Sequence, residues 1–427
     1  MHSVRSSRFI TVALAMALFF ALPSFASAQP LAEEGKGAAP RYVAVIDAGS
    51  SGTRLTLFTR VNVRGIAPQE AYEASISTEG LSSFAESPSR AGPDAIKPLL
   101  DQLDIFTQAQ GLAKGDVPVA LLATAGLRTV RLSQPAAVQE ILNSTRASLD
   151  ASGYPVLGNR ILPAVMEGSL AWLDANVLSG TVENKKKNVG IIEIGGASAQ
   201  VAFRARASKG PGIVTLAVNG STVSVLSVSY LGLGSNLARE DMQERTGGGK
   251  ICFPNNAAGA PPTTYDTDTA TPVVSQEANF DLKECREAYS AVVTSVGSRR
   301  SPAARVAPTD LRSTPGFADS RFIGLGGASF SFSDFQIPSA SSSRPALVSK
   351  VRSTCTGPNA WAKVISLSED LVSPFADTAC TNGTYVDALV FSRKGVGIAP
   401  KDFNGSPEFD GRSPSWPAGY ATTVLHP

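Results

Sequence analysis

Asp47-Ala-Gly-Ser-Ser-Gly-Thr-Arg54 and Glu193-Ile-Gly-Gly-Ala-Ser-Ala-Gln200 are two glycine-rich stretches of one design: each follows a short apolar run and begins with a carboxylate at the end of that run. A strand can deliver such an acid to its tip, where small residues let backbone N–H groups close around phosphate oxygens. Two loops of this kind indicate duplicated lobes that face each other across a cleft, with a nucleotide's phosphate chain and a divalent cation between them. The alternative is two tight strand turns without a ligand.

The N-terminus has the pattern of a secretory signal peptide. Arg5 and Arg8 precede an apolar stretch over residues 9–22, and Ala26-Ser-Ala28 provides a cleavage site. We therefore predict a signal peptide over residues 1–28, a flexible leader over residues 29–40, and export to the periplasm or the medium. Because the apolar stretch is shorter than the roughly 20 residues that span a bilayer, we expect no retained membrane anchor.

The net charge of the chain is too small to attract a polyanionic partner over long range. The formal net charge is +2, and loss of Arg5 and Arg8 with the signal peptide brings it to zero. We expect no nucleic-acid partner, and any basic site must be local. About 400 residues remain after cleavage, which is enough for two domains with sizeable cores. We expect a monomer.

Histidine is almost absent, which restricts the chemistry. The only two are His2, in the signal peptide, and His426, beside the C-terminus. Ser-His-Asp hydrolysis, phosphohistidine intermediates and histidine-ligated catalytic metals are therefore disfavoured. A catalytic base would be a carboxylate, which fits the activation of water beside a hard cation held by oxygens.

The four cysteines all lie in the second half of the chain: Cys252, Cys285, Cys355 and Cys380. An oxidising compartment makes disulfides the default, and three pairings are possible. We favour bonds between cysteines that are neighbours in the sequence, Cys252 with Cys285 and Cys355 with Cys380. Each bond would then close one local segment of the chain. A zinc site is the poorer alternative, since there is no C-x-x-C spacing and no nearby histidine.

The pattern along the chain is that of an α/β protein. Strands are expected on either side of the first glycine loop, as a hairpin, and over residues 117–122, 213–228 and 388–391. Helices are expected over residues 95–108, 136–151 and 416–425. One more helix is expected to begin at Glu167 and to have one apolar face, and another is expected to end at Arg245.

A third loop repeats the second almost residue for residue, since Leu325-Gly-Gly-Ala-Ser329 copies Ile194-Gly-Gly-Ala-Ser198. Its acid position holds Gly324. Without a carboxylate to hold water around a cation, this loop is interpreted as a structural turn.

In order, these segments resemble the apyrase conserved regions of the ecto-nucleoside triphosphate diphosphohydrolase family, in an exported, bacterial-type form. The five regions correspond to Asp47–Arg54 (DAGSSGTR), Ala123–Arg128 (ATAGxR), Glu167-Gly168 with Trp172 and Asn176, Glu193–Gln200, and Trp416 with Gly419 and Tyr420. Tyr230-Leu-Gly-Leu-Gly234 is a further family-like stretch. The resemblance covers nearly the whole mature chain. Trp172 and Trp416 are expected to be packing residues.

The resemblance implies an actin-like, ribonuclease-H-like duplicated fold with the active site between two lobes. Lobe I would span residues 41–160, completed by residues 396–427, and lobe II residues 161–395. The implied activity is hydrolysis of nucleoside tri- and diphosphates by direct attack of water.

The resemblance also implies roles for single residues. Glu167 would be the general base, and Ser198 and Gln200 would hold the attacking water. Asp47 and Glu193 would bind Ca²⁺ or Mg²⁺ through water. The residues implied to cradle the phosphates are Ser50, Ser51, Gly52, Thr53, Arg54, Thr124, Arg128, Gly195, Gly196 and Ala197.

Some alternatives stay open. Glu193 stands where the family usually has aspartate, which leaves the preferred cation undecided. Arg54 and Arg128 could instead form surface salt bridges. An exopolyphosphatase or guanosine pentaphosphate phosphohydrolase begins with a similar loop, but those relatives usually end the second loop in glutamate, where this chain has Gln200. A non-catalytic exported nucleotide-binding protein is the other alternative, and nucleobase selectivity cannot be inferred.

Overall fold

A computed structural model describes residues 39–60, 66–76, 80–184, 187–255, 278–299, 306–370, 378–407, 409 and 411–427. The predicted signal peptide lies outside these ranges, as does the predicted leader except for residues 39 and 40. Among the helices that the structure describes, none is both long and apolar enough to cross a membrane.

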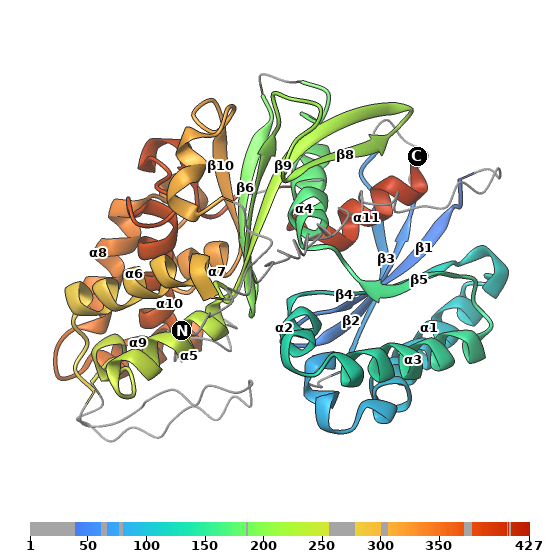
Figure 1. The fold of residues 1–427 in the computed structure, drawn as a ribbon, viewed down its shortest axis with the longest axis horizontal. Helices are drawn as coiled ribbons and strands as arrows, with labels where there is room; N and C mark the ends of the chain where they lie inside the picture. Colours follow the sequence, from blue (N-terminus) through green and yellow to red (C-terminus); the bar gives the residue numbers. More distant parts are fainter. Residues whose placement is uncertain are drawn as a thin grey trace, which may run out of the picture.

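The first half of the chain builds a five-stranded sheet in the order β3-β2-β1-β4-β5 (Figure 1). Its strands are β1 (Tyr42–Ala48), β2 (Thr53–Thr59), β3 (Gln69–Ile76), β4 (Val119–Ala123) and β5 (Val156–Ile161). The helices that follow β3 and β4 are α1 (Lys97–Ala109), α2 (Ala125–Ser133) and α3 (Pro135–Ser152). β1 and β2 form the predicted antiparallel hairpin, whereas β4 and β5 continue the sheet in parallel with β1.

The central strand β1 is buried on both faces, which explains its nearly continuous apolar sequence. Val43 and Val45 belong to the core between the two sheets, and Ala44 and Ile46 belong to the core beneath α1 and α3. The strand thereby holds its last acid, Asp47, at the end of a rigid element.

The second half builds a six-stranded sheet in the order β11-β10-β6-β7-β9-β8. Its strands are β6 (Val189–Ile194), β7 (Ser198–Arg204), β8 (Ile213–Val218), β9 (Ser221–Leu231), β10 (Arg321–Gly326) and β11 (Phe403–Asn404). The helices of this half are α5 (Ser235–Thr246), α6 (Leu282–Arg299), α7 (Gly327–Ser333), α8 (Arg344–Cys355), α9 (Ala360–Asp370) and α10 (Ala379–Val386). Two α/β lobes result, in agreement with the predicted class.

Two further helices lie between the sheets, α4 (Ala164–Leu178) and α11 (Trp416–Leu425) (Figure 1). They pack closely, since a Cβ at Gly419 would lie 2.0 Å from the Leu170 carbonyl oxygen. Every α4 residue from Met166 to Val177 is buried. The helix is therefore buried on all sides and not, as expected from the sequence, on one apolar face alone. Trp172 and Trp416 are both buried in this core, which confirms that they are packing residues.

One predicted element is wrong. Residues 388–391 form no strand, because α10 runs directly into a π-helical turn over Asp387–Phe391. The run is apolar and short, and a fully buried helical segment has the same pattern as a fully buried strand. The other expected elements named above are present, including the terminal helix α11 and β8 with β9.

Both favoured disulfides are present. Cys252 is bonded to Cys285 and Cys355 to Cys380, so each bond closes a local segment of the second lobe. The predicted lobe boundaries stay a prediction. Within the C-terminal segment that was assigned to lobe I, β11 pairs with β10 of the second sheet, while α11 packs against α4 and β1.

Candidate active site

The first glycine loop lies beside the start of α2 because of strand register. β1 and β4 are parallel neighbours, with Asp47 opposite Leu122, and the Thr124 N–H donates to the Ala48 carbonyl. The first turn of α2 packs against the loop, since a Cβ at Gly126 would lie only 3.0 Å from Ser50 Cα. The first and second sequence motifs therefore form one surface.

The second glycine loop joins β6 to β7 as a tight hairpin. Glu193 pairs with Gln200 across it, and the Gly195 N–H donates to the Ser198 carbonyl (3.0 Å). Its tip meets the first loop, because a Cβ at Gly196 would lie 2.6 Å from Ser50 Oγ. The two loops that the sequence singles out therefore face each other across the junction of the lobes.

Arg128 links the two lobes at this junction. Its guanidinium donates to Glu167 Oε2 (2.5 Å), to Ser198 Oγ (3.3 Å) and to the Leu162 carbonyl (3.0 Å). Arg128 and Glu167 are both buried, so this is a buried ion pair and not the surface salt bridge considered as the alternative. A buried pair of this kind holds its partners in a fixed geometry.

Glu167 stands in the first turn of α4, and the residue after it sets how closely the helix approaches the second sheet. A Cβ at Gly168 would lie 2.6 Å from Ser227 Oγ and 3.0 Å from Gln200 Cβ. Glycine at this position therefore lets the carboxylate of Glu167 lie beside the β7 side chains.

Ser198 and Gln200 form a buried polar pair on β7. The Gln200 amide donates to Ser198 Oγ (2.6 Å) and to Ser229 Oγ (3.1 Å). Its carbonyl oxygen, Oε1, is buried and has no hydrogen-bond partner within the ranges that the structure describes. Because an unsatisfied buried acceptor is costly, this oxygen is suited to accept a hydrogen bond from a bound water or ligand.

Asp47 and Glu193 are partly buried acids in a negative environment. Burial, and secondarily the charge of Glu167, raises the pKa of Asp47 to about 7, against a smaller opposing effect of Arg54. Burial and the charges of Glu167 and Asp47 raise the pKa of Glu193 well above its ordinary value, while Arg128 opposes the shift. The site carries more negative charge than its own cationic groups compensate.

The two acids fit a divalent cation. Asp47 Oδ1 and Glu193 Oε2 are both buried and lack hydrogen-bond partners among the described residues. A cation would supply the missing positive charge. No three acidic, histidine or cysteine side chains converge closely enough to ligate a metal within the part of the chain that the structure describes. A cation here would therefore take most of its ligands from water and phosphate, as hard cations with few protein ligands do.

The phosphate residues implied by the resemblance fall into two groups. Thr53, Thr124 and Ala197 are buried, and Thr53 Oγ1 has no hydrogen-bond partner in the described part of the chain. Those at or near the surface of the two loops are Ser50, Ser51, Gly52, Gly195 and Gly196. Arg54 points outward and forms an ion pair with Glu73 on β3 (2.8 Å). In this arrangement Arg54 links β2 to β3, although its charge still lowers the pKa of Asp47.

The structure adds positioning residues that sequence reasoning missed. Ser229 holds the Gln200 amide from β9, where it is the register partner of Gln200. A Cβ at Gly80 would lie 2.4 Å from the Gly49 carbonyl oxygen, and one at Gly234 would lie 2.3 Å from the Ala197 nitrogen. Gly234 ends the family-like stretch noted in the sequence, whereas no local pattern points to Ser229 or Gly80.

Comparisons with known proteins show the family of this chain. Residues 36–426 match the model of the GDA1/CD39 (nucleoside phosphatase) family. A guanosine-diphosphatase of Schizosaccharomyces pombe is 34% identical over 212 residues, which are 47% of this chain and 37% of that protein. Probable apyrase 5 of Arabidopsis thaliana is 28% identical over 331 residues, 67% of this chain and 64% of that protein. The matched segments thus span about a third to two thirds of these relatives.

Among solved structures, the fold is similar to the crystal structure of nucleoside triphosphate hydrolases from Neospora caninum. The TM-score is 0.50 at 16% identity, covering 91% of this chain and 93% of that one. This similarity supports the predicted two-lobed, actin-like fold. With the family model matched along almost its full length, this chain belongs to the GDA1/CD39 (nucleoside phosphatase) family.

Proposed function

We propose that the protein is an apyrase, a divalent-cation-dependent hydrolase of nucleoside tri- and diphosphates that releases orthophosphate by direct in-line attack of water. The observation that carries the proposal is the buried network in which Arg128 joins Glu167 to Ser198 where the two glycine loops meet. Membership of a nucleoside phosphatase family and the similarity to proteins named apyrases support it.

Glu167 is the proposed general base. Arg128 donates to Oε2, which leaves Oε1 to take the proton from water. The water oxygen then forms a bond to the terminal phosphorus, while the bond from phosphorus to the bridging oxygen breaks and that oxygen leaves with the shortened nucleotide. Its negative charge is the charge to be stabilised.

Ser198 and Gln200 are the proposed water-holding residues. Ser198 Oγ accepts from Arg128 and Gln200, so its own O–H is available to donate, and Gln200 Oε1 is available to accept. Together they can fix the orientation of one water molecule.

The two glycine loops are proposed to enclose the phosphate chain. Small residues in both loops let backbone N–H groups approach phosphate oxygens from each lobe. Ser50, Thr53 and Thr124 add hydroxyl donors. Arg54 would have to leave Glu73 in order to contribute.

Ca²⁺ or Mg²⁺ is the proposed cofactor, held through water by Asp47 and Glu193. When bound, the cation would offset the negative charge that develops on the phosphate oxygens in the transition state. The unpartnered oxygens of the two acids and their raised pKa values support this assignment.

Export to the periplasm or the medium and a monomeric state belong to the same proposal. The N-terminal sequence pattern and the two disulfides support export.

The test is orthophosphate release by the purified chain from ATP, ADP, AMP and polyphosphate, each in Ca²⁺, Mg²⁺ and chelator. Cation-dependent release from ATP and ADP, but not from AMP, would support the proposal. Release from polyphosphate alone would identify an exopolyphosphatase instead. Binding of ATP without release from any substrate would identify a non-catalytic nucleotide-binding protein.

A further inference from the structure

A basic groove lies on the second lobe, between α6 and α8, and the segment Ser392–Lys394 closes one side of it. It has a volume of about 600 Å³, and six of its twelve lining residues are cationic: Lys283, Arg286, Arg344, Arg352, Arg393 and Lys394. Figure 1 shows α8 on the side of this lobe that faces away from the first sheet. The groove is therefore separate from the junction where the glycine loops meet.

Helical spacing places these charges along the groove. Lys283 and Arg286 are three residues apart on α6, so they share a face of that helix. Arg344 and Arg352 are separated by two turns of α8, with Val348 between them on the same face. Two helices thus present cations to one hollow, in a chain whose overall charge is nearly balanced.

A buried acid holds two of the arginines in position. Asp387, only 2% exposed, accepts from Arg286 Nε (2.9 Å) and Arg344 Nε (2.5 Å). Arg286 is thereby oriented through its Nε, and Arg344 through its Nε and, more weakly, one Nη2 N–H (3.4 Å). The remaining terminal N–H groups of both arginines are left for other partners. Pre-oriented guanidinium groups lose less side-chain entropy when they bind an anion.

The remaining cations of the groove are uncompensated. Lys283, Arg352, Arg393 and Lys394 are exposed, and their side chains form no ion pair with any residue in the described ranges. Glu287 is the only acid in the lining besides Asp387.

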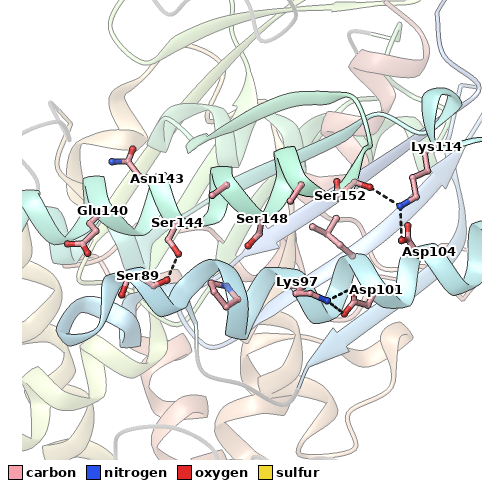
Figure 2. A pocket seen from close by; sticks show the side chains of 14 residues that line it. Ser89, Lys97, Asp101, Asp104, Lys114, Glu140, Asn143, Ser144, Ser148 and Ser152 are labelled. Atoms are coloured by element: carbon pink, nitrogen blue, oxygen red, sulfur yellow. Dashed lines mark hydrogen bonds and ion pairs between the residues drawn. The ribbon is translucent and has the colours of Figure 1, made fainter.

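The groove between α1 and α3 has a similar volume but a different character (Figure 2). Its two lysines are already paired, Lys97 with Asp101 and Lys114 with Asp104, both at 2.7 Å. Of these two grooves, the one on the second lobe therefore has an excess of positive charge, and the one between α1 and α3 does not.

We propose that the basic groove binds a small soluble ligand with two or more adjacent phosphate groups, at a site separate from the hydrolytic centre. The planar arginine fork matches phosphate oxygens with paired N–H groups. The volume is that of a small-molecule site and not of an extended track for a polymer. The proposal does not depend on hydrolysis.

The test is calorimetric titration of the full mature chain with tripolyphosphate in chelator, at low salt. The wild type is expected to bind one more equivalent than the variant Arg352→Glu/Arg393→Glu, or to bind the same number of equivalents with at least about tenfold higher affinity in the groove. The matched control is Lys209→Glu/Lys350→Glu, which makes the same charge change at exposed lysines outside the groove; Lys350 lies on α8 itself.

The control variant should retain the wild-type number of sites, and thermal unfolding should show that all three proteins are folded. Identical isotherms for the wild type and the groove variant would overturn the proposal. Sedimentation of the wild type with phosphatidylglycerol vesicles, combined with no loss of tripolyphosphate binding in the groove variant, would also overturn it in favour of a membrane-surface contact. Because chelator prevents cation-dependent hydrolysis, failure here is distinguishable from failure of the proposed activity.

Discussion

The second and third glycine loops share almost the same five residues and differ in what those residues do. Ile194-Gly-Gly-Ala-Ser198 and Leu325-Gly-Gly-Ala-Ser329 follow neighbouring parallel strands, β6 and β10, with Gly326 paired to Ile194. After the second loop the chain turns back as β7, whereas after the third it enters α7. The same local sequence is compatible with both outcomes, because small residues permit many backbone conformations.

The glycines meet different neighbours in the two loops. Gly196 leaves room for Ser50 of the other lobe. Gly326 has a φ of +56°, and a Cβ there would lie 2.7 Å from the Ile194 carbonyl oxygen, so it lets β10 pack against the end of β6. One glycine serves contact between the lobes, and the other serves packing within a sheet.

The acid position separates the loops most clearly. Glu193 is partly buried at the junction of the lobes, whereas a Cβ at its counterpart Gly324 would meet the Phe403 ring at 3.1 Å. A side chain at Gly324 would require Phe403 of β11 and Ala328 to shift by a few tenths of an ångström. The comparison teaches that loops of the same sequence differ in the residue before the motif and in the element that faces it. It also agrees with the interpretation of the third loop as a structural turn.

Glu193→Gly, which makes the second loop like the third, should have the largest effect. We expect cation-dependent orthophosphate release from ATP to fall about 1,000-fold, because the cation loses one of its two acids. The control is Glu183→Gly, which removes an exposed acid from the turn before β6. Retention of half the wild-type rate by Glu193→Gly would show that the acid position does not distinguish the loops.

Gly326→Ala should lower stability by about 2 kcal/mol, because of the positive φ and the close Ile194 carbonyl. Urea unfolding measures this. Gly220→Ala is the matched control, since Gly220 also has a positive φ (+71°), but a Cβ there would meet no atom of the described residues within 4 Å. Equal losses in the two variants would mean that the contact with Ile194 contributes nothing.

Gly196→Ala should reduce kcat/KM about tenfold, with little effect on stability, since the new methyl group would displace Ser50 from the second loop. Gly195→Ala is the neighbouring control, because its Cβ would meet only the Ser198 carbonyl oxygen, at 3.5 Å. Steady-state kinetics with ATP measures both. A smaller loss in Gly196→Ala than in Gly195→Ala would contradict the proposed contact between the loops.

The smallest of the expected effects is a difference between loop variants in how their stability depends on pH. In chelator, the folded state holds protons on Asp47 and Glu193 that the unfolded state has released, so stability falls as pH rises above about 4. The fall continues through about pH 7, the raised pKa of Asp47. Asp174, whose pKa burial also raises to about 7, adds to this slope in every variant.

Glu193→Gln removes one of these groups and should make the slope shallower by up to about 1 kcal/mol per pH unit. Gly326→Ala should leave the slope unchanged. Urea unfolding at several pH values between 4 and 8 gives both slopes. Equal slopes in the wild type and Glu193→Gln would place the proton uptake elsewhere.

The sequence was sufficient where local pattern and motif agree. The hairpin around Asp47–Arg54, both disulfide pairs and the α/β class follow from runs, turns and spacing. The motifs also predicted which residues meet: Arg128, Glu167 and Ser198 come from three different segments and share one network. Their catalytic roles remain predictions.

The sequence was insufficient where tertiary contacts decide. Residues 388–391 were mistaken for a strand because burial on all sides removes periodicity. The ion pair of Arg54 with Glu73 depends on the register of β2 against β3, and the contact of Ser229 with Gln200 depends on that of β9 against β7. Strand register is set by the neighbouring strands and cannot be predicted from the sequence of one segment alone.

The most direct test of the central claim is orthophosphate release from ATP by the wild type and Glu167→Gln, measured side by side with saturating Mg²⁺ or Ca²⁺. Because glutamine cannot take a proton from water, the account predicts a loss of about 100-fold or more in kcat, with ATP binding retained. Glu183→Gln should match the wild type. An unchanged rate in Glu167→Gln would contradict the mechanism, since the buried carboxylate beside Arg128 would then have no part in activating water.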